Sequence, residues 1–130
     1  MKSRTDIAVI GAGPAGMAAA VMAADHGASV LLLDEQAAAG GQIYRAVGSQ
    51  KATGSAILGT EYYQGGALVD RLAASTVEHV TGATVWHVSN QREIGVSVDG
   101  AAELINADHI IIATGAQERP FPVPGWTLPG

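Results

Sequence analysis

Residues 7–16 read Ile-Ala-Val-Ile-Gly-Ala-Gly-Pro-Ala-Gly, an apolar run followed by glycines in the spacing G-x-G-x-x-G. The run predicts a buried parallel strand, and the alanine-rich stretch from Ala15 to about Asp25 predicts a helix. A second apolar run, Val30 to Leu33, adds another strand that ends at Asp34. The glycine spacing is a weak signal alone, but between a buried strand and a helix it predicts a dinucleotide-binding turn in a βαβ unit.

The glycines of this turn have separate physical roles. Gly11 permits the tight turn, Gly13 lets a pyrophosphate approach the backbone, and Gly16 lets the helix pack closely on the strand. The N–H groups at the start of the helix attract phosphate oxygens. The alternative is a turn that merely joins strand to helix. We expect six contiguous cofactor contacts: Gly11, Ala12, Gly13, Pro14, Ala15 and Gly16.

An acidic residue at the end of the second strand is the next candidate. The carboxylate of Asp34 is placed to accept hydrogen bonds from ribose hydroxyls, and it would repel the 2′-phosphate of NADP. Glu35 follows directly and is the second choice for the same role. The alternative for Asp34 is a solvated acid at a strand end.

The middle of the chain predicts a loop, a helix and a first additional strand. Residues 37–66 contain many glycines and predict a loop. Residues 67–75 predict a helix whose apolar face carries Leu68, Val69 and Leu72. Residues 84–88 then predict a strand.

The last part of the chain predicts a β-ribbon and a buried strand. The alternation in residues 94–98 predicts a half-exposed strand, and Asp99-Gly100 predicts a tight turn. Leu104-Ile105 continues the ribbon, and the run 110–113 predicts a fully buried strand beside residues 7–10. The fold class is therefore α/β, a Rossmann-like domain with a parallel sheet and a small antiparallel ribbon.

Composition excludes several classes of function. The chain has 130 residues, of which 48% are hydrophobic and 15% are charged, as expected for one globular domain. The net charge of −5 and the lack of a basic cluster disfavour a nucleic-acid partner. The absence of cysteine excludes disulfides and thiolate metal sites built from this chain, and the histidines lack metal-like spacing. No apolar run approaches the roughly 20 residues of a transmembrane helix, and no signal peptide is visible, so we expect a cytoplasmic protein.

Residues 9–16 resemble the opening of the flavoproteins that have two dinucleotide-binding domains. Residues 34–45, Asp-Glu-Gln followed by Gly-Gly-Gln-Ile-Tyr-Arg, resemble the large FAD subunits of opine oxidases, D-hydroxyproline dehydrogenases and hydrogen cyanide synthase. Residues 111–116 are similar to the Ala-Thr-Gly motif of the wider superfamily, and residues 117–126 again resemble the opine oxidase branch. The similarity covers essentially the whole chain.

This resemblance implies FAD, not NAD, at the first glycine turn. It places Gly41 and Gln42 along the pyrophosphate and flavin side of the cofactor. It also brings Thr114 and Gly115 close to the cofactor and makes Val85 a candidate for backbone contact with adenine. From the residues alone, the Gly40-Gly41 pair is a flexible loop and Thr114-Gly115 a strand-ending turn.

The resemblance also predicts an incomplete FAD domain. Residues 1–119 correspond to the N-terminal part of such a domain, and the proline-rich residues 120–130 to a linker toward an NAD(P)-type domain. The second G-x-G-x-x-G and the later Gly-Asp segment of the family are missing. A truncated chain, a broken gene and a short subunit completed by another chain remain open explanations.

Two classes of function remain. In the first, the chain is the FAD-binding portion of an oxidoreductase that acts on C–N bonds of amino acids, amines or opines, or relays electrons between subunits. Its partners would be a second flavoprotein subunit, together with an electron-transfer subunit, or else another copy of itself. In the second, it is a non-catalytic nucleotide-binding module or an inactive fragment. Because the chain shows no base, nucleophile or metal constellation, we assign it no catalytic residue.

Overall fold

The computed structural model describes residues 1–44, 59–116 and 123–125, without the side chains of residues 59–63. The linker expected at residues 120–130 therefore lies largely outside the described residues, as do residues 45–58 of the expected loop. The helices and strands follow in this order: β1 (Arg4–Ile10), α1 (Pro14–Asp25), β2 (Val30–Asp34), α3 (Gly59–Ala74), β3 (Glu78–Thr81), β4 (Ala83–Val88), β5 (Glu93–Val98) and β6 (Ala101–Ile112).

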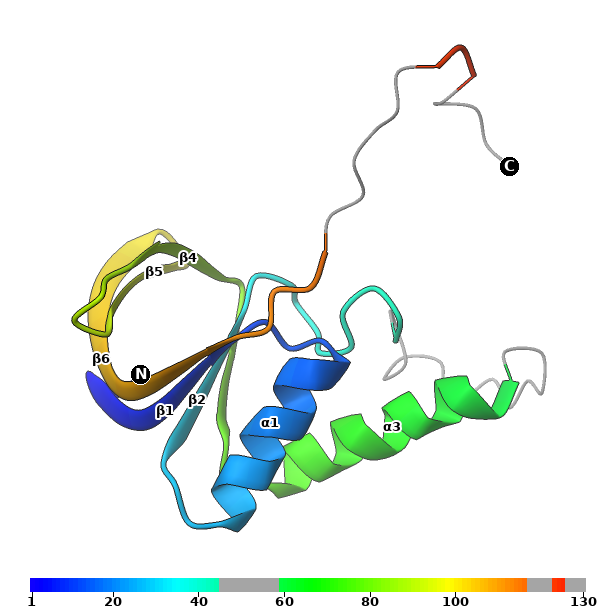
Figure 1. Ribbon diagram of the computed structural model, residues 1–130, viewed down its shortest axis with the longest axis horizontal. Helices are drawn as coiled ribbons and strands as arrows, with labels where there is room; N and C mark the ends of the chain where they lie inside the picture. Colours follow the sequence, from blue (N-terminus) through cyan, green and yellow to red (C-terminus); the bar gives the residue numbers. More distant parts are fainter. Residues whose placement is uncertain (45–58, 117–122, 126–130) are drawn as a thin grey trace.

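The strands form one mixed sheet with the order β3-β2-β1-β6-β5-β4. β3, β2, β1 and β6 are parallel neighbours, whereas β4, β5 and β6 pair antiparallel. Helices α1 and α3 lie together on one face, and the antiparallel ribbon curls away on the opposite side (Figure 1). This confirms the predicted Rossmann-like α/β fold with an antiparallel ribbon.

Two cores explain why β1 and β2 are apolar without alternation. Val9 and Leu32 pack with α1 and α3 in one core. Ala8 and Leu31, the preceding residue of each strand, pack with the ribbon in the other core. Because successive side chains of a strand point to opposite faces, a strand covered on both faces needs an uninterrupted apolar run.

The expected neighbour of β1 is confirmed. Residues 7–10 pair in parallel with residues 109–112, so that Ile10 lies opposite Ile112. The ribbon segment expected at Leu104-Ile105 and the buried strand expected at residues 110–113 belong to one strand, β6. The first half of β6 pairs with β5, and its second half pairs with β1. The tight turn is also confirmed, since Asp99 and Gly100 both have positive φ angles, as in the favoured hairpin turns.

The sequence interpretation was wrong about the start of the second helix and missed one strand. Helix α3 begins at Gly59, not at Ala67, and runs through the Gly65-Gly66 pair. A β-carbon added to Gly65 would collide with the ring of Tyr44, so tertiary packing requires glycine here and outweighs its low helix propensity. Strand β3 has only four residues and gives almost no periodic signal.

The prediction that residues 110–113 are fully buried was also wrong. Ile110 is partly buried against the ribbon core, but Ile111 is 36% exposed and Ile112 is 67% exposed. The register with β1 is as expected, but no described segment covers this end of β6. Pairing with β1 fixes the position of this strand but does not by itself bury the side chains at its end.

We expect a half-buried histidine on β3 to make the stability of the fold depend on pH. The Nε2 atom of His79 is buried and has no hydrogen-bond partner among the described residues. Burial lowers the pKa of His79 below its ordinary value of 6.5, and the nearby charge of Asp34 opposes this shift only in part. The folded state therefore binds a proton less readily than the unfolded chain.

The resulting stability is fully present above about pH 6.5 and is lost as the pH falls below that value. We expect the melting temperature of the parent to fall over this range and that of His79→Leu to fall less. The exposed His109, changed to Gln, is the matched control and should keep the parental pH dependence. Identical pH profiles for His79→Leu and the parent would contradict the assignment.

Candidate dinucleotide site

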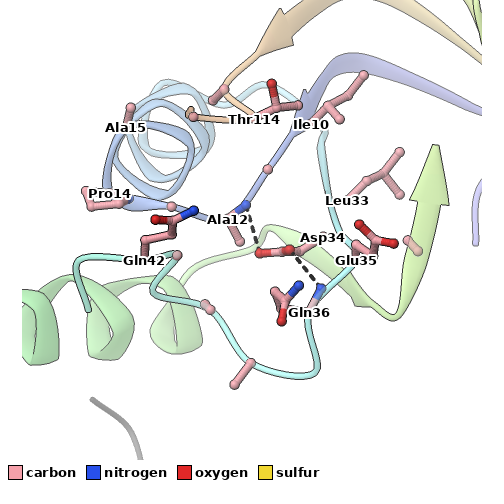
Figure 2. A pocket seen from close by; sticks show the side chains of 18 of the residues that line it. Ile10, Ala12, Pro14, Ala15, Leu33, Asp34, Glu35, Gln36, Gln42 and Thr114 are labelled. Carbon is pink, nitrogen blue, oxygen red and sulfur yellow. Dashed lines mark hydrogen bonds between the residues drawn. The ribbon is translucent and has the colours of Figure 1, made fainter. Parts of the chain in front are cut away.

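A pocket of about 910 Å³ lies where β1, β2 and β6 end. Its size falls within the range of small-molecule and cofactor sites. The structure brings the predicted cofactor-binding residues together here, except Gly16, which is buried. The predicted residues that line the pocket are Gly11, Ala12, Gly13, Pro14, Ala15, Asp34, Glu35, Gly41, Gln42, Val85, Thr114 and Gly115. Figure 2 shows how the side chains that line it surround the opening.

The glycine turn is packed against the rest of the fold on one side and open on the other. Gly11 has a φ of +102°, and a β-carbon there would collide with the carbonyl of Ala113. A β-carbon on Gly16 would collide with the carbonyl of Gly11. A β-carbon on Gly13, in contrast, would meet no atom within 4 Å. Because Gly13 lines the pocket, the space kept clear beside it is available to a ligand.

The N-terminus of α1 is prepared for an anion. Gly13 is the N-cap and supplies no side chain, Pro14 stands in the first turn, and the first turn contains no acidic residue. Among the described residues, no side-chain cap hydrogen bond is made at this end of the helix. The first N–H groups of the helix, together with the helix dipole, favour a phosphate at this end.

Asp34 binds the backbone of two loops. Its Oδ2 accepts a hydrogen bond from the N–H of Ala12 at 2.9 Å, and its Oδ1 accepts one from the N–H of Gln36 at 3.0 Å (Figure 2). The residue is only 8% exposed, whereas Glu35 is exposed. A carboxylate has about four acceptor sites, so Asp34 can still accept from a ribose hydroxyl. Both acids line the pocket, and the choice between them for the ribose stays a prediction.

The two acids should differ in their effect on stability. In Asp34→Ala the buried N–H of Ala12 loses its acceptor, which costs about 1–3 kcal/mol. Glu35→Ala, an exposed change, should alter the free energy of unfolding by less than about 0.5 kcal/mol. Urea denaturation of both variants measures this difference. Equal stability of the two variants would mean that Asp34 does not brace the turn.

The loop after β2 lies against the glycine turn. The N–H of Gly40 donates to the carbonyl of Ala12 at 2.9 Å. Gly41 has a φ of +60°, and a β-carbon there would lie 2.9 Å from the Cα of Gly13. Gly40 has a φ of +136°, and a β-carbon there would collide with the carbonyl of Tyr44. Close backbone contact therefore requires both glycines, which is more specific than the flexible loop that the residues alone suggest.

Three consecutive alanines of this loop line the pocket and were missed by the sequence interpretation. Residues 37–39 line the pocket between Asp34 and the Gly40-Gly41 pair. Small side chains carry no chemical signal of their own. Their only trace in the sequence is their position between an acid and a glycine pair that were both recognised.

The family model of the pyridine nucleotide-disulphide oxidoreductases matches residues 5–129. The chain belongs to this family. It is 45% identical to an opine oxidase subunit of Agrobacterium tumefaciens (strain Ach5), over 96% of this chain and 26% of that protein. It is 33% identical to hydrogen cyanide synthase subunit HcnB of Pseudomonas protegens, over 94% of this chain and 27% of that protein. The chain thus spans about a quarter of the length of these curated relatives.

A solved structure supports the same assignment. Thioredoxin reductase from Streptococcus pyogenes superimposes with a TM-score of 0.66 and 32% identity, covering 96% of this chain and 40% of the other. The family and its structural neighbours confirm the expected cofactor, FAD. Since the chain contains no cysteine, its own residues cannot reduce a disulfide despite the family's name.

The pocket fits this cofactor on structural grounds. The uncapped start of α1 and the open space beside Gly13 suit the pyrophosphate. Asp34 and Glu35 offer carboxylates for the ribose, and Val85 lines the pocket from β4. Thr114 and Gly115 line it where β6 ends. These individual contacts stay predictions.

Proposed function

We propose that this chain supplies the FAD-binding part of an enzyme complex that oxidises C–N bonds of amino acids, amines or opines, or relays the electrons of that reaction between subunits. The observation that carries the proposal is the 41–45% identity to three opine oxidase subunits over nearly the whole chain. The residues that would hold the cofactor belong to one continuous pocket, which supports a binding role. When bound, the flavin supplies the electron-accepting group.

In this proposal the described residues bind and orient the cofactor, and we assign none of them a catalytic role in amine chemistry. Among residues 1–44, 59–116 and 123–125, no three acidic or histidine side chains gather as metal ligands. Within the same residues, no helix is long and apolar enough to cross a membrane. The relatives are named as subunits, so we place the amine-oxidising groups on a partner subunit. The partners in this proposal are a second flavoprotein subunit and an electron-transfer subunit. We also propose a cytoplasmic location.

Within this proposal, residues 1–119 form the FAD-binding unit, and residues 120–130 lead to an NAD(P)-type domain. A non-catalytic nucleotide-binding module is the competing function. It would share the pocket but would never exchange electrons with an amine.

Anaerobic reduction of the bound flavin distinguishes these functions. We expect the flavin on the isolated chain to stay oxidised when proline, glycine, sarcosine or an opine is added. With the co-purified partner subunits present, one of these substrates should bleach it. Bleaching on the isolated chain would place the oxidising site here, and a flavin that never reduces in the whole complex would favour the non-catalytic module.

A further inference from the structure

A second cavity, of about 440 Å³, lies beside β3. Its size falls within the range of small-molecule sites. Three segments line it: the loop after β2, the second half of α3, and β3 with the residues that precede it. Residues 37–39, Val69, Leu72 and Val77 give it a largely apolar lining. The cavity shares residues 37–39 with the dinucleotide pocket, but the glycine turn and the two acids line only the dinucleotide pocket.

The polar groups of this second cavity come from the end of α3 and from β3. Ser75, His79 and Thr81 line it beside the apolar residues. The hydroxyl of Ser75 is already used, because it donates to the carbonyl of Leu72 at 2.7 Å and accepts from the N–H of Val77 at 3.3 Å. The imidazole of His79, in contrast, has a buried Nε2 atom with no hydrogen-bond partner among the described residues. Buried polar groups are normally hydrogen-bonded, so a partner is expected for this imidazole.

We propose that the second cavity binds a small neutral molecule with an apolar body and one hydroxyl group, and that the hydroxyl group pairs with the imidazole of His79. The described residues that line the cavity include no acidic, lysine or arginine side chain, so a charged ligand would lose its hydration without compensation. Because the lining is otherwise apolar, a molecule with an apolar body gains more from the cavity than water does.

The state of His79 favours a hydroxyl group as its partner. Burial lowers the pKa of His79 below 6.5, so the imidazole is mostly neutral above that pH. One nitrogen of a neutral imidazole donates and the other accepts, and a hydroxyl group can pair with either. The ring lines the cavity although its Nε2 atom is covered, so pairing requires the ring to rotate about its Cβ–Cγ bond, a torsion with broad energy wells. The proposal is independent of FAD, since His79 does not line the dinucleotide pocket.

Phenol and toluene test the proposal, because they have nearly the same shape and only phenol has a hydroxyl group. Each is titrated into the full chain above pH 6.5, and ¹H–¹⁵N correlation spectra follow the backbone amides and the histidine ring nitrogens. We expect phenol to shift the ring nitrogens of His79 saturably and to leave those of His26, His87 and His109 unchanged. At the backbone amide of Val77, phenol should bind about 2 to 12 times more tightly than toluene, as expected for one neutral hydrogen bond.

Variants separate the hydrogen bond from the shape of the cavity. His79→Leu has no polar group and should bind phenol and toluene equally, whereas His79→Gln keeps a donor and an acceptor and should still prefer phenol. Ala73→Trp places a large side chain in the cavity from an exposed position of α3 and should bind neither molecule. Ala67→Trp, an exposed change of the same helix outside the lining, is the matched control and should bind both as the parent does.

Several results would overturn the proposal. Equal affinity of the parent for phenol and toluene, or no saturable shift at His79, would remove the hydrogen bond. Shifts of similar size at all four histidines would show non-specific binding. Parental affinity in an Ala73→Trp variant with the parental melting temperature would place the binding elsewhere. If Ala73→Trp does not fold, the His79 variants decide, because a preference for phenol that persists in His79→Leu contradicts the proposal.

Discussion

Gly13→Val is expected to fold as the parent does and to lose its affinity for FAD and ADP. A β-carbon at Gly13 meets no protein atom within 4 Å, so the fold tolerates it. The two methyl groups of valine would, however, fill the space in which the pyrophosphate must approach the N-terminus of α1. We expect the dissociation constant to rise at least about 100-fold, which corresponds to roughly 2.7 kcal/mol.

Calorimetric titration of ADP and of FAD into Gly13→Val measures this loss, and the melting temperature shows whether the fold is retained. Gly27 provides a control, because a β-carbon there also meets nothing within 4 Å, but the residue lies beyond the opposite end of α1. Its φ of +88° predicts some loss of stability for Gly27→Ala and no loss of affinity. If Gly13→Val bound FAD and ADP as tightly as the parent, the glycine turn would not be part of the cofactor site.

Gly16→Val is expected to have the opposite profile, with the fold itself lost. A β-carbon at Gly16 would collide with the backbone carbonyl of Gly11 and lie 3.3 Å from the β-carbon of Ala113. Backbone atoms cannot rotate away as a side chain can, so α1 would have to move off β1. Overpacking of a core typically costs about 1–3 kcal/mol, and a collision with backbone should exceed about 3 kcal/mol.

Urea denaturation of Gly16→Val beside Gly13→Val tests this assignment of roles within one turn. A loss of that size is a large part of the net stability of a domain of this length, so much of the variant should be unfolded or insoluble. Ala18→Val is the matched control, since Ala18 is an exposed residue of the same helix. A Gly16→Val variant as stable as the parent would show that helix and strand are not in the close contact seen here.

The parts of the fold that could be predicted from sequence are those in which local pattern and tertiary packing agree. Residues 7–34 carry apolar runs, glycines and a carboxylate at positions that each have one physical use, and the structure places them as expected. The pairing of β1 with β6 was also predictable, because both runs are apolar on both faces.

The sequence-based predictions were wrong where the structure depends on contacts between residues far apart in sequence. Gly65 is tolerated within α3 because the ring of Tyr44 needs the space, and no local pattern reveals that contact. The exposure of Ile112 reflects what covers β6, which the composition of the strand does not specify. The hydrogen bond from the Nε2 of Gln42 to the carbonyl oxygen of Ala116 joins residues whose proximity follows only from the completed sheet.

Titration of FAD into the purified parent chain tests most directly whether this pocket binds FAD. Visible flavin absorbance that co-elutes with the chain in gel filtration would show the same binding independently. We predict saturable binding of one FAD per chain, with ADP competing for the same site and NADP competing poorly because Asp34 and Glu35 repel its 2′-phosphate. FAD that fails to saturate the chain, or that binds without competition from ADP, would contradict binding in this pocket.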